Sequence, residues 1–161
     1  MSPYSFGEQL ENSRDYGDVF DVVKKAVKQS IGRERAGLML YLGNLPLQVG
    51  AFYGVGSNGI VVNRKLLSSI SFETIAELNS YVFTLLLHEY LHSLGYMDEG
   101  NVRRLVYEIS RENFGEDHPA ARFARDPPLP RIPPSELQPG TEEPELEIIK
   151  DFDRSSTSYI N

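Results

Sequence analysis

One long apolar segment predicts a buried helix at the centre of the fold. Residues 72–94 contain no Pro or Gly, and their apolar positions recur at helical spacing. Ser71 is a suitable N-cap, or Thr74 if the helix is shorter, and Gly95 ends the helix because Gly readily adopts the left-handed conformation. Residues 82–87 are apolar almost all round the helix, so we expect it to be central and buried. The apolar positions are Leu78, Tyr81, Val82, Leu85 and Leu86.

The remaining pattern predicts a small sheet and several shorter helices. Strands are expected at residues 37–42, 49–55 and 59–63, and Gly56-Ser57-Asn58 suits a hairpin between the last two. Further helices are expected at residues 16–31, 64–70, 99–114 and 119–125, whereas residues 1–13 are expected to be irregular. These elements favour an α+β fold in which a small mixed sheet packs on the central helix.

The composition changes after Arg125, which indicates a domain of residues 1–125 and an extension of residues 126–161. Seven of the ten prolines lie between residues 127 and 144, with acidic residues interleaved, so this segment is expected to be extended. Apolar residues follow that are suited to docking: Leu146, Ile148, Ile149, Phe152, Tyr159 and Ile160. The extension either packs along the domain or stays mobile, or it crosses a substrate cleft and brings Asp151 or Asp153 near the active site.

Composition argues against several classes of protein. The 161 residues suit one domain, and the absence of cysteine excludes disulfides and a thiolate zinc site. No apolar run reaches the roughly 18 residues of a membrane span, and the N-terminus lacks a basic and apolar leader, so we expect a cytoplasmic protein. The net charge is −7, of which residues 126–161 carry −5. A nearly neutral body with an acidic tail is not suited to nucleic acid, and no membrane partner is expected.

The central helix carries a group of residues that suits a metal ion. His88 and His92 are four residues apart, so both imidazoles lie on one helix face and can bind one zinc ion. Glu89 lies about 100° round the helix from His88, where it can act on a metal-bound water without being a ligand. The alternative is a buried helix whose two histidines are structural. We favour the metal site because two of the three histidines in the chain lie in this motif, and buried ionisable groups need partners.

Residues 88–98 read HExxHxxGxxD and resemble the zinc site of the zincin metallopeptidases. The spacing is similar to the snapalysin-like variant of the metzincins, in which aspartate is the third ligand, although no methionine follows Asp98 to form a Met-turn. The chain also resembles small predicted prokaryotic zincins. The resemblance implies a zincin-like fold in which an edge strand lies above the metal and binds the substrate backbone. The hairpin at residues 49–63 stands in the right chain order for that role.

Four residues compete to be the third metal ligand. Asp98 has the metzincin spacing and follows a glycine that can turn the chain back, but it could instead be the N-cap of the next helix. Glu108, Glu112 and His118 are the other candidates. Glu112 lies about 20 Å along the predicted second helix and His118 lies beyond it, so Asp98 is the favoured ligand.

The motif and the resemblance together predict a zinc metallopeptidase that acts on a peptide or protein substrate. Its metal ligands would be His88, His92 and Asp98, and Glu89 would be the general base. Candidates to stabilise an oxyanion, by residue type alone, are Tyr53, Tyr90, Tyr96, Tyr107 and Arg103. Two alternatives stay open: a zincin-fold binding or regulatory module with a structural or absent metal, and a latent peptidase blocked by its own C-terminal extension.

Overall fold

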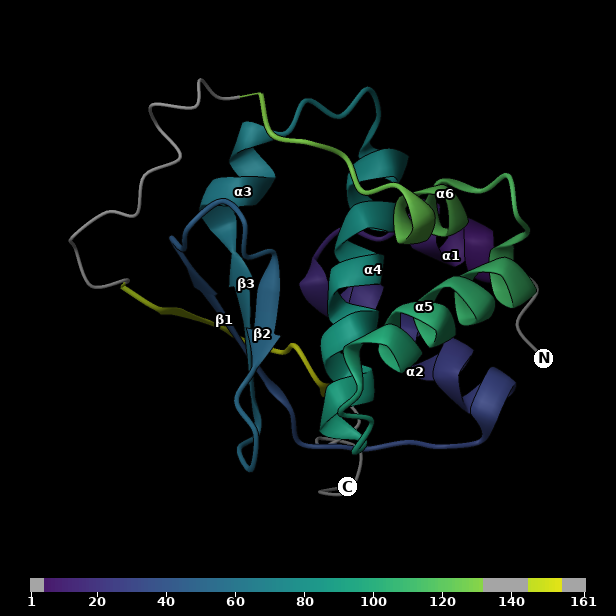
Figure 1. Ribbon diagram of the computed structural model, residues 1–161, viewed down its shortest axis with the longest axis horizontal. Coiled ribbons are helices and arrows are strands. Elements are labelled where there is room, and N and C mark those ends of the chain that lie inside the picture. The colour runs from purple at the N-terminus through teal and green to yellow at the C-terminus, as the bar shows by residue number, and fades with distance from the viewer. Residues whose placement is uncertain (1–4, 132–144, 155–161) are drawn as a thin grey trace.

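The computed structural model describes residues 5–131 and 145–154 and places a small sheet beside a group of helices (Figure 1). The helices are α1 (Phe6–Glu11), α2 (Tyr16–Ile31), α3 (Arg64–Ser69), α4 (Ile75–Ser93), α5 (Glu99–Phe114) and α6 (Pro119–Arg125). The strands are β1 (Met39–Gly43), β2 (Ala51–Tyr53), β3 (Gly59–Asn63) and β4 (Glu147–Ile149). The predicted α+β class is confirmed. None of the described helices combines the length and apolarity that a membrane crossing requires.

Helix α4 lies between the sheet and the helices α1, α2, α5 and α6 (Figure 1). Thr74 caps its start, because the Thr74 hydroxyl accepts a hydrogen bond from the Glu77 N–H at 3.1 Å. The helix stops just before Gly95, whose φ of +106° suits glycine. Its residues pack against α1, α2, α5 and α6 and against β2 and β3, so the prediction of a central buried helix is confirmed.

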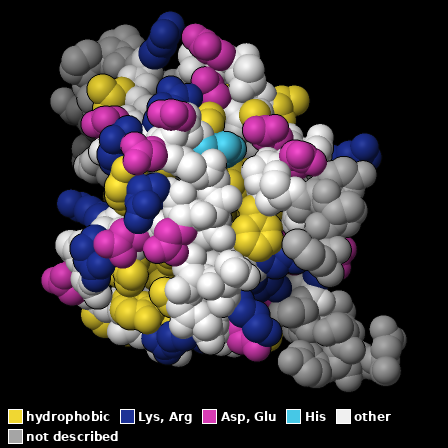
Figure 2. Space-filling view, turned by 90° about the vertical axis from the view of Figure 1, so that its right-hand side faces the viewer, with side chains coloured by type: hydrophobic (Ala, Val, Ile, Leu, Met, Phe, Trp, Pro, Cys, Tyr) yellow, Lys and Arg dark blue, Asp and Glu magenta, His cyan; other side chains and the backbone are white. Residues whose placement is uncertain are grey.

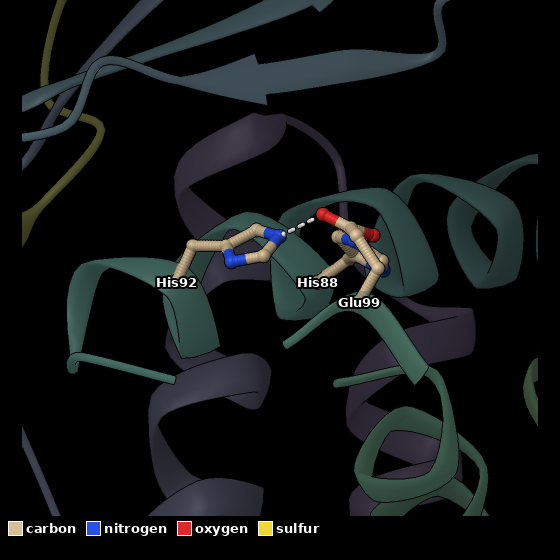
Figure 3. Close-up of side chains that lie close together, drawn as sticks. All are labelled: His88, His92 and Glu99. Carbon is tan, nitrogen blue, oxygen red and sulfur yellow. Dashed lines mark hydrogen bonds and ion pairs between the residues drawn. The ribbon is translucent and has the colours of Figure 1, made fainter. Parts of the chain in front are cut away.

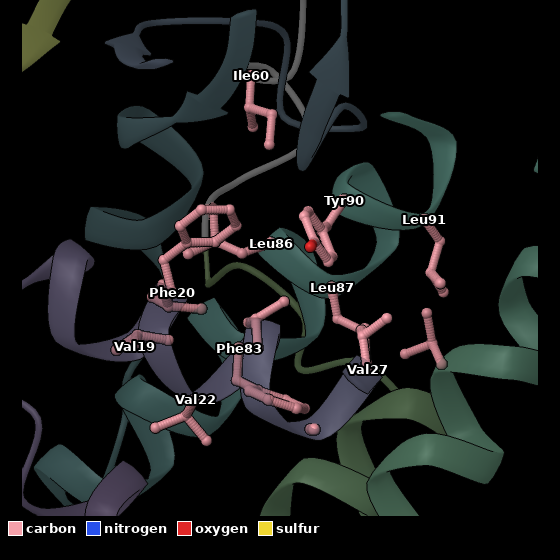
Figure 4. Close-up of a cluster of buried hydrophobic side chains, with 14 of the residues drawn as sticks. Val19, Phe20, Val22, Val27, Ile60, Phe83, Leu86, Leu87, Tyr90 and Leu91 are labelled. Carbon is pink, nitrogen blue, oxygen red and sulfur yellow. The ribbon is translucent and has the colours of Figure 1, made fainter. Parts of the chain in front are cut away.

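The main hydrophobic core lies between α4, α2 and the inner face of the sheet (Figure 4). Phe20 of α2 contacts Tyr90 of α4 edge-on, with ring centroids 5.4 Å apart. The Tyr90 hydroxyl accepts a hydrogen bond from the Arg35 N–H at 2.8 Å, so the buried phenol has a polar partner. One face of α4 is therefore committed to the core, and another is left to line a cleft.

The sheet has the strand order β2-β3-β1-β4. Strands β2 and β3 form the predicted antiparallel hairpin, and β1 pairs with β3 in parallel. The short strand β2 lies at the end of this order and above α4, with one edge unpaired by any described strand. The fold thus presents a free strand edge beside the helix that carries the HExxH residues.

Two elements depart from the sequence prediction. Helix α1 forms where an irregular lead-in is expected, and its N-cap Ser5 accepts a hydrogen bond from the Glu8 N–H at 3.2 Å. Ser5 and Glu8 have the Ser-x-x-Glu spacing of a capping box, which is a local signal for a helix start. Strand β4 is the second departure, and it pairs with β1 in antiparallel, with Leu40 opposite Ile149.

The C-terminal extension contributes to the domain rather than lying apart from it. Phe152 is only 2% exposed and stacks on Phe20 with ring centroids 4.2 Å apart. The Asp153 carboxylate accepts hydrogen bonds from the Lys24 ammonium at 2.6 Å and the Leu38 N–H at 3.1 Å. Neither Asp151 nor Asp153 reaches the cleft, so a blocking role for these two is wrong. Of the other apolar residues, Ile149 docks on the core, Leu146 and Ile148 are exposed, and Tyr159 and Ile160 lie outside the described residues.

Phe152→Ala should lower the free energy of unfolding by about 3–5 kcal/mol, because it removes a buried aromatic ring from the core. Urea denaturation of the full chain measures the loss. Ile148→Ala is the matched control, since Ile148 lies four residues earlier and is 51% exposed, and it should change stability by less than about 1 kcal/mol. Equal effects of the two changes would show that the extension does not belong to the core.

Candidate metal centre

Helix α4 brings His88 and His92 to the same face, as the four-residue spacing predicts. Their ring centroids are 4.9 Å apart, and both side chains point toward the start of α5 (Figure 3). The prediction that these two imidazoles converge on one point is confirmed by this geometry.

The third group at this point is Glu99, the first residue of α5. One carboxylate oxygen of Glu99 lies 2.9 Å from His88 Nε2, and the other lies 2.7 Å from His92 Nε2 (Figure 3). One ligand atom from each of the three residues lies within 4.8 Å of the other two, so the group could hold a metal ion. Two imidazole nitrogens and one carboxylate are a donor set found in catalytic zinc sites.

Asp98, the favoured third ligand from the sequence, does not belong to this group. It is the N-cap of α5, and its carboxylate accepts a hydrogen bond from the Asn101 N–H at 2.8 Å. A carboxylate in that role satisfies an otherwise unpaired donor of the first helical turn. The structure therefore corrects the prediction by one residue, from Asp98 to Glu99.

The other three candidates for third ligand lie elsewhere. Glu108 forms an ion pair with Arg104 at 3.0 Å, and Glu112 is exposed further along α5. His118 is the N-cap of α6, where its Nδ1 accepts a hydrogen bond from the Ala120 N–H at 3.1 Å and its ring stacks on Phe114. None of the three lines the cleft beside His88.

Hydrogen bonding at His92 shows that its Nε2 needs a cation. Nδ1 of His92 lies 2.8 Å from the carbonyl oxygen of Tyr96, which only accepts hydrogen bonds, so Nδ1 carries a proton. In a neutral imidazole the Nε2 lone pair would then face the Glu99 carboxylate at 2.7 Å, which is repulsive. Either a second proton or a metal ion satisfies this contact. The carbonyl of Tyr96 orients His92 in the way that outer partners orient metal-bound histidines.

The ionisation states of His88 and Glu99 also suit the binding of a metal ion. Burial lowers the pKa of His88, with His92 and Arg103 acting in the same direction and Glu99 opposing them. A lowered pKa favours the neutral imidazole, which is the form that binds metals. Burial alone would raise the pKa of Glu99, but the neighbouring His88 and His92 hold it below its usual value, so its carboxylate is ionised.

Glu89 lies beside the three residues but does not join them. Its side chain is buried, with the residue 6% exposed, and it accepts a hydrogen bond from the Tyr53 N–H of β2. Burial raises the pKa of Glu89 to about 7, although His92 and the Tyr53 N–H partly oppose the rise. A carboxylate with a pKa near neutrality is suited to taking up and returning a proton.

The free edge of β2 faces this carboxylate. Gly54 donates to the Gly59 carbonyl at 3.1 Å, and Gly50 accepts from Asn63 at 2.9 Å. Because hydrogen-bonded pairs alternate along an antiparallel ladder, the N–H and C=O groups of Ala51 and Tyr53 turn to the other edge. The Tyr53 N–H reaches Glu89 from there, and the remaining groups are available to an extended chain.

A cleft of about 1040 Å³ begins at His88 and His92 and follows α4 to Leu85 and Tyr81. Strand β2 forms one side, and α5 and α6 form the other. Strand β2 enters so close to α4 that a side chain at Gly50 would meet Leu85 at 2.8 Å. Figure 2 shows charged and hydrophobic side chains around the histidine that is visible on this face.

The described part of the predicted extension forms the end of the cleft. Residues 127–130, Pro-Pro-Leu-Pro, line it together with Phe123 of α6. This segment runs from α6 toward α3 (Figure 1) and is held there by a hydrogen bond from the Arg131 N–H to the Ser69 carbonyl at 3.0 Å. The segment is thus a wall of the cleft, and residues 132–144 lie outside the described residues.

The structure distinguishes the five candidates for oxyanion stabilisation by their positions and partners. Tyr90 lies in the core, Tyr96 packs under Arg33, and Tyr107 packs against Arg125. The Tyr53 hydroxyl donates a hydrogen bond to the Ser57 carbonyl at 2.6 Å. Arg103 is the remaining candidate, and it is exposed and lines the cleft.

Comparison of the chain with protein-family models, with curated proteins and with solved structures gives no match. The functional assignment therefore depends on the HExxH sequence and on the geometry of the described residues.

Glu99→Gln should weaken zinc binding by more than about 100-fold, because changes in outer partners alone cost about 10- to 100-fold. Asp98→Asn is the matched control. It should leave zinc affinity within a few-fold, since asparagine is an equally good N-cap. Competition with a chromophoric chelator measures both affinities. A larger loss in Asp98→Asn than in Glu99→Gln would restore Asp98 as the ligand.

In the metal-free protein, Glu89→Gln should become more stable relative to wild type as pH rises from about 4.5 to about 8. Glu89 has a pKa of 4.5 when unfolded and about 7 when folded, so between these values the unfolded state releases a proton that the folded state keeps, and the folded state loses stability as pH rises. The contribution of the Glu89 proton to the free energy of unfolding is fully present below pH 4.5, and it is lost as the pH rises from 4.5 to about 7. The difference should reach roughly 2–3 kcal/mol by urea denaturation in chelator, and a pH-independent difference would contradict it.

Proposed function

We propose that this protein is a zinc-dependent peptidase of the zincin type, with His88, His92 and Glu99 as the metal ligands. The observation that carries the proposal is the position of Glu89. A buried carboxylate with a pKa of about 7 lies between the ligand group and the free edge of a strand. A metal site with a purely structural role has no need of such a carboxylate.

The three ligands leave room for a substrate, since catalytic zinc sites use three protein ligands and keep one position open. An ion bound there would supply Lewis-acid chemistry, polarising a substrate carbonyl and making water a nucleophile near neutral pH. Glu89 takes the proton from the attacking water and delivers it to the leaving amine nitrogen. Its raised pKa lets one group do both steps.

The free edge of β2 supports a peptide as the substrate. The C=O of Tyr53 and both backbone groups of Ala51 are turned to the cleft, where an extended chain can add as a further strand. Main-chain hydrogen bonds of this kind require a peptide backbone. Because the same edge reaches Glu89 through the Tyr53 N–H, a bound backbone would lie next to the general base.

The contacts of Glu99 also favour a second candidate, a binding or regulatory module. The ion pairs of Glu99 with His88 and His92 join α5 to α4 without a metal if the histidines are protonated. In that case the cleft would bind a peptide without cleaving it. Zinc content of the purified protein separates the two, because the module has no requirement for a stoichiometric ion.

Glu89→Gln should retain zinc and reduce kcat on a fluorescence-quenched peptide by about 10²- to 10⁴-fold, the usual contribution of a general base. Glutamine keeps the shape of the side chain but does not accept a proton at neutral pH. Glu112→Gln is the control, since Glu112 is an exposed carboxylate of α5 outside the cleft, and it should behave as wild type. Undiminished hydrolysis by the Glu89→Gln protein would rule out this mechanism.

A further inference from the structure

The charged side chains of the cleft are divided between two acids and two arginines. Among the described residues that line it, the acids are Glu89 and Glu99 and the bases are Arg103 and Arg125. Glu99 belongs to the candidate metal centre, and Glu89 lies beside it. The two arginines lie on the opposite wall from β2, in a chain whose net charge is −7. The two arginines therefore place positive charge in the cleft of a protein that is acidic overall.

Arg103 faces the cleft because of its place in α5. Glu99, Arg103 and Val106 are separated by four and three residues, so they form one stripe of the helix, and all three line the cleft. Arg103 lies one turn, about 6 Å, from Glu99 along the helix. Its charge also acts on His88, whose pKa it helps to lower. The guanidinium is thus close to the metal centre without belonging to it.

Arg103 has no anionic partner in the described part of the chain. Its nearest partner by helix spacing would be Glu99, but both carboxylate oxygens of Glu99 are turned to the histidines. The guanidinium of Arg103 makes no hydrogen bond or ion pair with any described residue. The next residue behaves differently: Arg104 donates to both carboxylate oxygens of Glu108 at 3.0 Å and to Asn101 at 2.6 Å.

A positive side chain next to a divalent cation is electrostatically unfavourable unless an anion accompanies it. No described side chain in the cleft supplies that anion, because the Glu99 carboxylate is turned to the two histidines and Glu89 is buried, which favours its protonated form. Arg125 is less suited to receive it, since it belongs to α6 beside the proline segment and lies against the ring of Tyr107. An anion brought by the substrate would be bound most directly by Arg103.

We infer that Arg103 binds a carboxylate of the peptide substrate, located within about one or two residues of the bond that is cleaved. The distance follows from the single helical turn between Arg103 and Glu99 and from the 3.8 Å between neighbouring Cα atoms of a peptide. Guanidinium and carboxylate pair through two parallel hydrogen bonds, which gives specificity as well as affinity. The carboxylate is either the C-terminus of the substrate or an acidic side chain. This inference rests on the proposed peptidase function and names the class of substrate.

Peptide binding to the zinc-loaded Glu89→Gln protein tests this without turnover. Two pairs of fluorescent peptides are compared by anisotropy. The members of the first pair differ in having a free or an amidated C-terminus. The members of the second pair are both amidated and differ in having an internal Glu or Gln. Adding Arg103→Gln should weaken binding of the carboxylate-bearing member of at least one pair by about 10- to 100-fold, as for a hydrogen bond to a charged group. The neutral member should change by less than about 2-fold. The pair that responds identifies the source of the carboxylate.

Two further variants act as controls in the same background. Arg104→Gln removes the neighbouring arginine, which is paired with Glu108 and does not line the cleft, and should leave all affinities unchanged. Arg103→Lys keeps the charge but loses the planar pair of donors, so it should restore only part of the preference for the carboxylate. Zinc content of every variant is measured alongside.

Three results would overturn the inference. The first is that Arg103→Gln weakens binding of charged and neutral peptides equally, as loss of an oxyanion-stabilising or structural residue would. The second is that Arg103→Gln weakens binding of neither kind of peptide. If wild type hydrolyses neutral peptides as well as acidic ones, the carboxylate role is also wrong while the peptidase function stands. If the zinc-loaded proteins neither bind nor hydrolyse any of the peptides, the proposed function fails and the role of Arg103 with it.

Discussion

The candidate metal centre depends on the short turn between α4 and α5. Gly95, with its positive φ, reverses the chain after α4, and the carbonyl of Tyr96 in the same turn holds the ring of His92. Asp98 then caps α5 and sets where that helix begins. Because α5 begins at that point, the side chain of Glu99 in its first turn points toward the two histidines. The turn therefore places the third member of the candidate group, Glu99, and also supports the ring of His92.

The opposite side of the cleft is held in place by Arg35. Its guanidinium donates to the Ser93 carbonyl at the end of α4 at 2.7 Å, and to the Tyr53 hydroxyl and the Ser57 carbonyl of the β2–β3 hairpin, both at 3.1 Å. One side chain thus fastens the hairpin to the end of α4. Arg35 therefore helps to hold the Tyr53 backbone near Glu89, although Arg35 itself does not line the cleft.

The electrostatics of the site follow from burial in a small space. Four ionisable residues lie close together where α4, α5 and β2 meet. His88, Glu89 and His92 lie within five residues of α4, and Glu99 begins α5. Removing a charge from water is costly unless a partner replaces the water. Glu89 responds by holding its proton to about pH 7, whereas Glu99 stays ionised through the histidines. Neighbouring carboxylates thereby take different roles.

The sequence by itself determined the long elements and the paired histidines. Helices α2 and α5, strand β3 and the hairpin follow from hydrophobic periodicity. Local signals such as Thr74 and Gly95 mark the two ends of α4, because each acts within one turn. The convergence of His88 and His92 also needs only helix geometry. Strand β4 was beyond this reasoning, because its pairing with β1 joins residues about 108 positions apart and its flanking composition indicates an extended tail.

Tertiary structure decided which acid lies beside the two histidines, and it decided the cleft. Asp98 and Glu99 are adjacent acids, and the spacing from His92 alone favours Asp98. The Asp98 carboxylate, however, caps α5 and is hydrogen-bonded to the helix backbone. The side chain of Glu99 points about 100° away from it round the helix. Whether that direction meets His88 and His92 depends on how α5 packs across α4. The same packing leaves Arg103 in the cleft without a partner among the described residues, and it places β2 beside Glu89. These are contacts between elements, and no local pattern encodes the angle at which two helices cross.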